Sequence, residues 1–110
     1  MERDSYLMEA RAAERQTAVS NTVIERPELH RFELAVEGGL AYASYRIEDG
    51  RLVLIHTEVP QELSGRGIGS QLAKGVFDIV RESKRKVVLR CPFMAAWYAR
   101  HLEYSDVVDG

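Results

Sequence analysis

The sequence lacks several features that would place it in common protein classes. It has one cysteine, Cys91, so no disulfide can form within the chain and a reducing compartment is expected. No apolar run approaches the roughly 20 residues that cross a bilayer, and residues 1–19 mix charged residues among apolar ones, unlike a secretory signal. The net charge of −2 provides no field that would attract phosphate backbones. We therefore expect a cytoplasmic protein that binds neither a membrane nor nucleic acid.

The length and composition allow one domain. A chain of 110 residues, 45% of them hydrophobic, can bury one core made of a sheet and a few helices. Residues 1–22 differ from the rest, because Ser5 can cap a helix over Tyr6–Val19 but the apolar stripe there is weak. We expect residues 1–22 to form a leader, mobile or helical, and residues 23–110 to form the domain, as a monomer or weak dimer.

Alternating residues and turn signals predict an antiparallel meander in the first half of the domain. Apolar and polar side chains alternate over residues 31–37, and Gly38-Gly39 permits a tight turn into a second strand at Leu40–Ile47. Asp49-Gly50 then gives the strongest hairpin signal in the chain, followed by a third strand at Leu52–Val59.

The second half of the domain predicts a parallel crossover. Pro60 ends the third strand, and apolar residues at helical spacing predict a helix to about Glu82. Val87-Val88-Leu89 is typical of a buried strand, which lies parallel to the third strand in a βαβ unit. Pro92 suits the first turn of a last helix, Phe93–His101. The predicted fold class is α/β: a mixed sheet with an antiparallel meander, a βαβ crossover and a C-terminal helix.

The segment most suggestive of chemistry is the glycine-rich turn Ser64-Gly65-Arg66-Gly67-Ile68-Gly69-Ser70. The first turn of a helix has unpaired N–H groups that bind phosphate oxygens, and glycines let a diphosphate approach the backbone. Arg66 can add a charge-assisted contact. A P-loop is excluded because Gln71 follows Ser70, and a dinucleotide fold is disfavoured because no acidic residue ends the next strand.

This turn resembles the Q/R-x-x-G-x-G/A turn that binds the coenzyme A diphosphate in GCN5-related N-acetyltransferases, with Ser64 in place of Gln or Arg. Over residues 23–108 the chain resembles the small, one-domain members of that family. The motifs that carry this likeness, beyond the turn, are His56-Thr57-Glu58-Val59-Pro60, Cys91-Pro92-Phe93 and Tyr98…His101-x-Glu103-Tyr104, with Leu102 departing from the usual proline.

The resemblance implies a minimal acetyltransferase fold with acetyl-CoA as cofactor and an unidentified amine as acceptor. The residues that it assigns to coenzyme A binding are Glu58, Val59, Ser64, Gly65, Arg66, Gly67, Ile68, Gly69 and Ser70. No metal is expected. Few elements remain that can build an acceptor site, so the alternative is a non-catalytic acyl-CoA-binding or interaction module.

His56 is the candidate general base. Alternation along the strand puts His56 on one face with Leu52, Leu54 and Glu58, and an imidazole titrates near neutrality. If that face meets the cofactor, His56 can take the proton of the amine; otherwise it is a hydrogen-bonded structural histidine.

Two further residues are candidates for the chemistry of transfer. Cys91 precedes Pro92 at a helix start, where its thiol can be activated and accept the acetyl group, or it is a small buried hydrophobe. Tyr98 can protonate the leaving thiolate. His101, Glu103 and Tyr104 are expected mainly to anchor the C-terminus.

Overall fold

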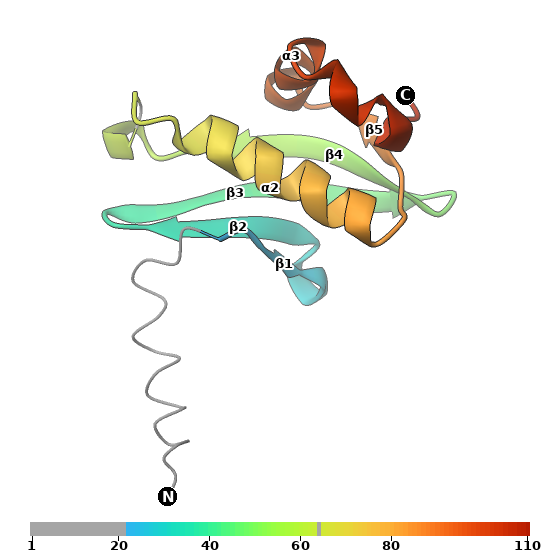
Figure 1. Ribbon diagram of the computed structural model, residues 1–110. Coiled ribbons are helices and arrows are strands. Elements are labelled where there is room, and N and C mark those ends of the chain that lie inside the picture. The colour runs from blue at the N-terminus through green and yellow to red at the C-terminus, as the bar shows by residue number, and fades with distance from the viewer. Residues whose placement is uncertain (1–21, 64) are drawn as a thin grey trace, which may run out of the picture.

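The computed structural model describes residues 22–63 and 65–110, so the helix predicted over Tyr6–Val19 and the side chain of Ser64 lie outside the described residues. Within the described residues, one mixed five-stranded sheet, in the order β1-β2-β3-β4-β5, carries two α-helices and three 3-10 turns (Figure 1). The predicted α/β class is confirmed. The elements are β1 (Ile24–Arg26), η1 (Pro27–Leu29), β2 (Arg31–Val36), β3 (Gly39–Glu48), β4 (Arg51–Glu58), η2 (Gln61–Leu63), α2 (Ile68–Glu82), β5 (Val87–Leu89), α3 (Pro92–Ala99) and η3 (Leu102–Val107).

The predicted antiparallel meander is formed by β2, β3 and β4. Asp49 and Gly50 both have positive φ, 53° and 76°, as a two-residue primed hairpin turn requires. The first turn lies one residue earlier than predicted, at Glu37 and Gly38, because Gly39 already pairs with Val36 in the sheet.

An edge strand, β1, was missed by the sequence analysis. It pairs antiparallel with β2 and has only three residues before Pro27, too few to show a period of two. Glu25 anchors it from the middle. The Tyr45 hydroxyl donates to the Glu25 carboxylate at 2.6 Å, and the Arg85 guanidinium donates to both carboxylate oxygens at 2.8 and 3.1 Å. This network ties β1 to β3 and to the loop after α2.

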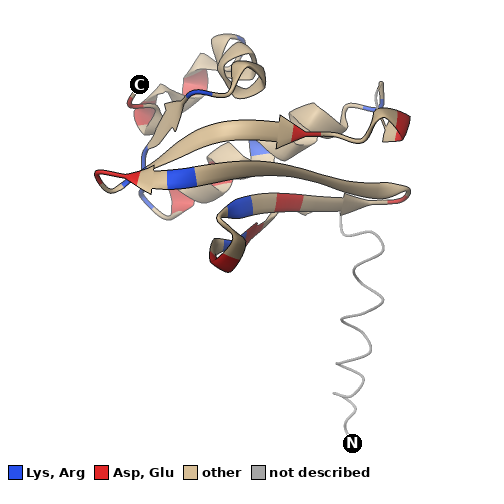
Figure 2. Cartoon of the chain, turned by 180° about the vertical axis from the view of Figure 1, so that it is seen from behind, with Lys and Arg blue, Asp and Glu red and all other residues tan. Residues whose placement is uncertain are grey.

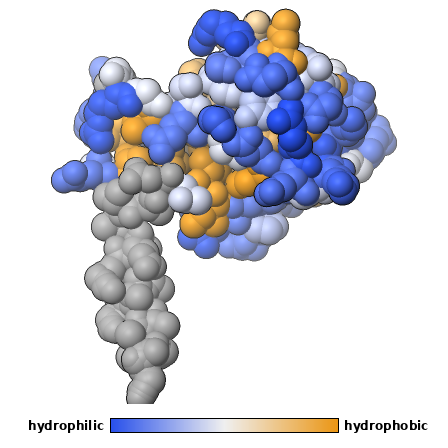
Figure 3. All heavy atoms as spheres, in the orientation of Figure 1, coloured by the Kyte–Doolittle hydropathy of each residue, from blue (hydrophilic) through white to orange (hydrophobic). Residues whose placement is uncertain are grey.

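The predicted parallel crossover is also confirmed, with β4 and β5 parallel and α2 between them in sequence. Helix α2 ends at Glu82 as expected, and its predicted apolar stripe is buried against the sheet. Its outward side is mostly hydrophilic in the space-filling view (Figure 3). The buried residues of α2 are Ile68, Leu72, Ala73, Val76, Phe77 and Val80.

The two faces of the sheet differ. The face that carries α2 holds the core, including Phe32, Leu34 and Leu54. Among the described residues no helix crosses the other face, and Figure 2, seen from that side, shows charged residues along β2, β3 and β4. We call it the open face. The connection from β1 to β2 is only the short turn η1, so it contributes no covering helix.

The C-terminal segment packs beside α2 and β5. Helix α3 begins at Pro92 as predicted but ends at Ala99, two residues early, where Arg100 leaves helical geometry. Tyr104 in η3 is buried, and its hydroxyl donates to Asp78 on α2 at 2.6 Å. The final residues then run beside β5, where the Leu89 amide donates to the Gly110 carbonyl at 2.8 Å.

Candidate functional site

A bulge in β4 determines the geometry of the site. Ser44 pairs with His56 whereas its neighbour Tyr45 pairs with Leu54, so Ile55 is an extra residue with no partner on β3. Strand β5 pairs with β4 only over Leu52–Leu54. Beyond the bulge β4 therefore keeps β3 as its neighbour, and the sheet opens between the ends of β4 and β5.

The bulge shows that the face predicted for His56 is wrong. An extra residue shifts the alternation by one, so the residues after Ile55 point to the opposite side from the pattern set before it. Leu52 and Leu54 lie in the core under α2, whereas His56 pairs with Ser44 on the open face, with 56% of its side chain exposed. A period-two pattern in sequence cannot reveal such a shift.

His56 and Glu58 form a pair on this open face. The His56 Nε2 atom lies 2.9 Å from a Glu58 carboxylate oxygen, so Glu58 accepts a hydrogen bond from the imidazole. The Tyr42 ring lies beside His56, with centroids 6.3 Å apart, and the Arg31 guanidinium covers Tyr42 at 4.5 Å. With its Nε2 proton held by Glu58, His56 leaves Nδ1 free to accept a proton. Glu58, which the resemblance assigns to coenzyme A binding, thus contacts the candidate general base His56.

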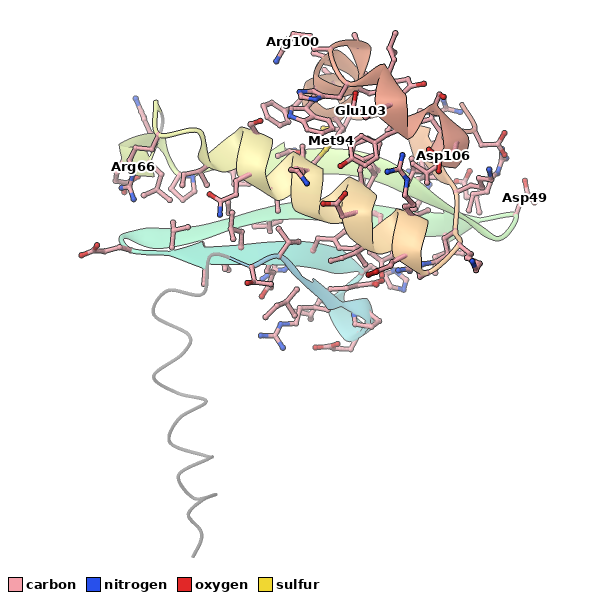
Figure 4. The ribbon with its side chains drawn as sticks, viewed as in Figure 1. Asp49, Arg66, Met94, Arg100, Glu103 and Asp106 are labelled. Carbon is pink, nitrogen blue, oxygen red and sulfur yellow. The ribbon has the colours of Figure 1, made fainter. Side chains whose placement is uncertain are left out.

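The glycine-rich turn precedes α2, as the sequence predicts. Gly65 and Gly67 have φ of 82° and 73°, values that glycine adopts most easily, and a Cβ at either position would meet no atom within 4 Å. Gly67 is the N-cap of α2, no side chain of the described residues caps the helix, and its first turn carries no acidic residue. Arg66 extends from the same turn, at the opposite end of the molecule from Asp49, and its Nη2 donates to the Glu37 carbonyl at 3.4 Å (Figure 4). The helix N-terminus thus remains suited to an anion.

The third glycine has a packing role. A Cβ at Gly69 would lie 2.7 Å from the ring of Phe93 at the start of α3, so any larger residue there would force the Phe93 ring to move. Ser70, the next residue, accepts a hydrogen bond from the Trp97 indole at 2.9 Å. The turn and α3 are thereby fixed to one another. No sequence pattern predicts either contact, Gly69 with Phe93 or Ser70 with Trp97, and only the packing reveals them.

Cys91 lies at the opening between β4 and β5. It is the residue before α3 and is 3% exposed, and its Sγ lies 3.2 Å from the Thr57 hydroxyl on β4. Thr57 pairs with Ala43 on the core side of the sheet, so this contact bridges the two diverging strands from within. Val59, two residues after Thr57, packs against the same core. The thiol and His56 therefore lie on opposite sides of β4.

The last candidates belong to an aromatic cluster around Phe77 of α2. Tyr98 stacks on Phe77 with ring centroids 6.3 Å apart. Trp97 also stacks on Phe77, with ring centroids 5.3 Å apart. His101 stacks on Trp97 at 3.7 Å and lies 3.5 Å from Glu103. Together with Tyr104 these rings hold the C-terminal segment on α2, the anchoring role expected of His101 and Tyr104.

A groove of about 440 Å³ lies between α2 and the segment formed by α3 and η3. It begins at the glycine-rich turn and follows the outer side of α2. The residues that line it include Gly67, Ser70, Lys74, Trp97, His101 and Glu103. In Figure 4, Glu103 lies where this segment faces α2. Sequence patterns did not indicate the groove, because its two walls are about 30 residues apart in the chain.

A sequence profile described as GCN5-related N-acetyl-transferase matches residues 31–107. The chain belongs to this family. In sequence, it matches no curated protein. The match spans the meander, the glycine-rich turn, the crossover and helices α2 and α3, so the residues of the candidate site described above fall within it.

A solved structure supports the same assignment. The chain is similar to the NMR solution structure of a GCN5-like candidate N-acetyltransferase from Staphylococcus aureus, with 28% sequence identity and a TM-score of 0.62. The likeness covers 84% of this chain and 92% of the other. The two molecules therefore share the overall fold over most of both chains.

In residues 22–63 and 65–110, no three His, Cys, Asp or Glu side chains are grouped so as to hold a metal ion. None of the helices in these ranges is long and apolar enough to cross a membrane.

Proposed function

We propose that this family member is an acetyl-CoA-dependent N-acetyltransferase that transfers an acetyl group to an unidentified amine. Within the family we place it with the small, one-domain members, to which human N-acetyltransferase domain-containing protein 1 belongs. The observation that carries the proposal is the uncapped N-terminus of α2 behind Gly67, next to the opening between β4 and β5.

The residues of the turn fit coenzyme A. The space where side chains of Gly65 and Gly67 would extend is open, so a diphosphate can reach the backbone N–H groups of Ile68, Gly69 and Ser70. Arg66 flanks that approach. Acetyl-CoA, when bound, supplies an acetyl group activated as a thioester. With the diphosphate at the turn, the sheet opening beside Val59 is the place for the pantetheine arm.

His56 serves as the general base in this proposal. It takes the proton that the acceptor amine loses as its nitrogen attacks, directly or through a water molecule. Glu58 holds the imidazole by its Nε2 proton and stabilises the imidazolium that results. Because His56 lies on the open face, the amine approaches from that face while the thioester lies in the opening of the sheet.

Cys91 is placed close to the reacting atoms but is not the nucleophile in this proposal. Its burial and its contact with Thr57 suit a residue that shapes the opening between the strands. Tyr98 supplies the proton for the leaving thiolate. Direct transfer needs only an oriented amine and one base, which His56 provides.

The alternative, a non-catalytic acyl-CoA-binding module, has one observation in its favour. The short η1 connection leaves the open face without an enclosing wall among the described residues. A panel of amines, including polyamines, amino acids, aminoglycosides and lysine peptides, decides between the two. Acetyl transfer to any of them supports the enzyme, whereas binding of coenzyme A without transfer to any of them favours the module.

Binding itself is tested with two matched variants. Gly67→Asn keeps a residue that tolerates positive φ but fills the space before α2, and Gly50→Asn makes the same change at φ 76°, with equally open space, in the distant hairpin. Coenzyme A should raise the melting temperature of the wild type and of Gly50→Asn, because a ligand that binds only the folded state stabilises it. Gly67→Asn should lose that increase. The absence of any increase at millimolar coenzyme A in the wild type would falsify the proposal.

A further inference from the structure

We propose that the open face binds a carboxylate of the acceptor, so that the acceptor is an amine whose carbon chain also carries a carboxylate group. In this assignment the amine lies at His56 and the carboxylate at Arg90. The inference rests on the proposed function, since it names the class of acceptor for the same site. It adds Arg90 as a residue that determines which amine is accepted.

Arg90 lies at the edge of the opening between β4 and β5. Its backbone amide donates to the Leu54 carbonyl at 3.0 Å, one residue beyond the last paired position of β5. Arg90 therefore lies beside Ile55, the bulge residue, and His56 is the next residue of β4. Neighbouring strands are about 4.8 Å apart, so the backbones of Arg90 and His56 are near neighbours at this end of the sheet.

The Arg90 side chain extends on the same side of the sheet as His56. Val87 belongs to the core cluster under α2, and Leu89 packs against that cluster. Successive side chains of a strand point to opposite faces, so Val88 and Arg90 belong to the open face. Arg90 is exposed there, at the end of the strand. Both side chains therefore face the solvent from which an acceptor arrives.

The charge of Arg90 acts on a carboxylate of the same face. Arg46 donates to Glu48 on β3, and both side chains lie on the open face. The pKa of Glu48 is below its ordinary value of 4.5, first because of the hydrogen bond from Arg46 and further because of the charges of Arg46 and Arg90. The Arg90 guanidinium therefore lies within electrostatic range of this face.

Arg90 differs from the other charged residues of the open face because they are already paired with one another. The pairs are Arg26 and Arg31 with Glu33, Arg46 with Glu48, and His56 with Glu58. Arg90 forms no ion pair with any of the described residues. A guanidinium is always charged, and its planar fork of donors matches a carboxylate. Arg90 is therefore the cation of this face that a carboxylate of the acceptor can bind.

An apolar side chain lies between these two polar ends. Ile55 is 37% exposed and is not part of the core cluster. It offers an apolar contact to the carbon chain of an acceptor that has its amine at His56 and its carboxylate at Arg90. A polyamine or an aminoglycoside brings a second cation next to Arg90, which repulsion between like charges disfavours. Amino acids therefore fit this face better than polycations.

Acetylation of matched acceptors by the full chain tests the inference. Each ω-amino acid from glycine to 6-aminohexanoate is compared with the alkylamine that has the same chain without the carboxylate, such as 4-aminobutyrate with propylamine. The wild type should prefer the amino acid of the best length by about 5- to 50-fold in kcat/KM, mainly through KM, as expected of one charge-assisted contact.

Three variants assign that preference to Arg90. Arg90→Gln should bring the preference close to one, because the carboxylate loses its partner. Arg90→Lys, which keeps the charge without the planar fork, should retain part of it. Arg100→Gln is the matched control, since it removes another exposed arginine, at the C-cap of α3, and should keep the full preference. Coenzyme A should bind Arg90→Gln and the wild type equally well.

A measurement of binding complements the rates, because it does not depend on turnover. The side-chain Nε–Hε signal of Arg90 can be followed by NMR and assigned from its absence in Arg90→Gln. Addition of 4-aminobutyrate should shift this signal in a saturable way, whereas propylamine, which has no carboxylate, should leave it nearly unchanged.

The outcomes separate this inference from the proposed function. If the wild type acetylates alkylamines as well as amino acids, or if Arg90→Gln keeps the preference, the inference fails although the proposed function stands. If Arg90→Gln loses affinity for coenzyme A, Arg90 belongs to the cofactor site and the inference fails likewise. If 4-aminobutyrate shifts the Arg90 signal but no amine is acetylated, the carboxylate site is confirmed and the proposed function fails. If neither occurs, both are overturned.

Discussion

Strand β4 consists of two regions that differ in almost every respect. Before the bulge, Leu52, Val53 and Leu54 are buried and pair with both β3 and β5. After it, His56 and Glu58 are exposed and β4 pairs with β3 alone. The first region joins the meander to the crossover. The second region, which begins the motif His56–Pro60, has no β5 residue beside it, so the sheet is open there.

The difference shows how one residue can separate stability from function within a strand. A strand without Ile55 would continue the alternation set by Leu52 and Leu54, and His56 would point into the core. With Ile55 as a bulge, the buried side chains stay under α2 and the histidine turns to the open face. Substitutions on the two sides of Ile55 should therefore affect different measurements.

The largest expected effect is on the rate, after the bulge. His56→Ala should lower kcat roughly 10²- to 10⁴-fold with any amine that proves to be a substrate, because the proton of the amine loses its acceptor. The melting temperature and the affinity for coenzyme A should stay close to the wild type, since the side chain is largely exposed. A steady-state assay with a thermal scan of the same preparation measures both quantities.

Cys91→Ala is the control that distinguishes direct from covalent transfer. Direct transfer through His56 predicts that this variant retains turnover, and that acetyl-CoA alone leaves no acetyl group on the wild-type protein. Mass spectrometry of the wild-type protein after treatment with acetyl-CoA shows whether an acetyl group has been added. An adduct that disappears in Cys91→Ala would assign the nucleophile to Cys91 and contradict direct transfer.

A second prediction compares two neighbours in β4, one on each side of the boundary. Leu54 is 0% exposed in the core, so Leu54→Ala should lower the free energy of unfolding by about 2–5 kcal/mol. Ile55 is 37% exposed, and Ile55→Ala should cost less than about 1 kcal/mol. Urea denaturation of both variants measures the difference. Equal losses of free energy would mean that Ile55 packs as tightly as the core, which would contradict the division of β4 into two regions at the bulge.

The smallest effect concerns the edge strand β1 and depends on pH. The hydrogen bond from Arg85 holds the pKa of Glu25 below its ordinary value of 4.5 despite partial burial. A lowered carboxyl pKa stabilises the folded state above pH 4.5, and this contribution is lost as the pH falls through the pKa of the folded state. Glu25→Gln should therefore be less stable than the wild type at neutral pH, and this difference should shrink on acidification.

The control for this prediction is Glu28→Gln, which removes an exposed carboxylate from the adjoining turn η1. Denaturation curves at about pH 7 and about pH 3 measure the free energy of unfolding of all three proteins. A constant difference between wild type and Glu25→Gln across that range would show that the stabilisation does not depend on the charge of Glu25.

The comparison also explains which parts of the structure were predictable. Asp49-Gly50 predicted its hairpin because two adjacent residues must adopt positive φ, which few other pairs do readily. The stripe on α2 and the apolar run at Val87–Leu89 predicted the crossover, because burial repeats with the period of each element. Strand β1 was too short to show such a period.

The candidate site was predictable only in its glycine-rich turn. Gly65 and Gly67 are there for their backbone angles, which are local, whereas Gly69 is there because Phe93 packs on it from α3. The contacts Trp97–Ser70 and Thr57–Cys91 join residues 27 and 34 positions apart, and no periodicity links such pairs. The groove behind His101 depends on the same long-range packing.

The sequence by itself determined the α/β class, the order of the meander and crossover, and the position of the turn before α2, because these follow from local angles and from the period of burial. Only the tertiary structure decided on which face of the sheet His56 and Glu58 lie, that β4 and β5 separate beside Cys91, and that α3 encloses a groove on α2. The face on which His56 and Glu58 lie depends on how β4 pairs with β3, because a bulge exists only where one strand has an extra residue relative to its neighbour. The other two arise from side chains that meet only once the chain has folded.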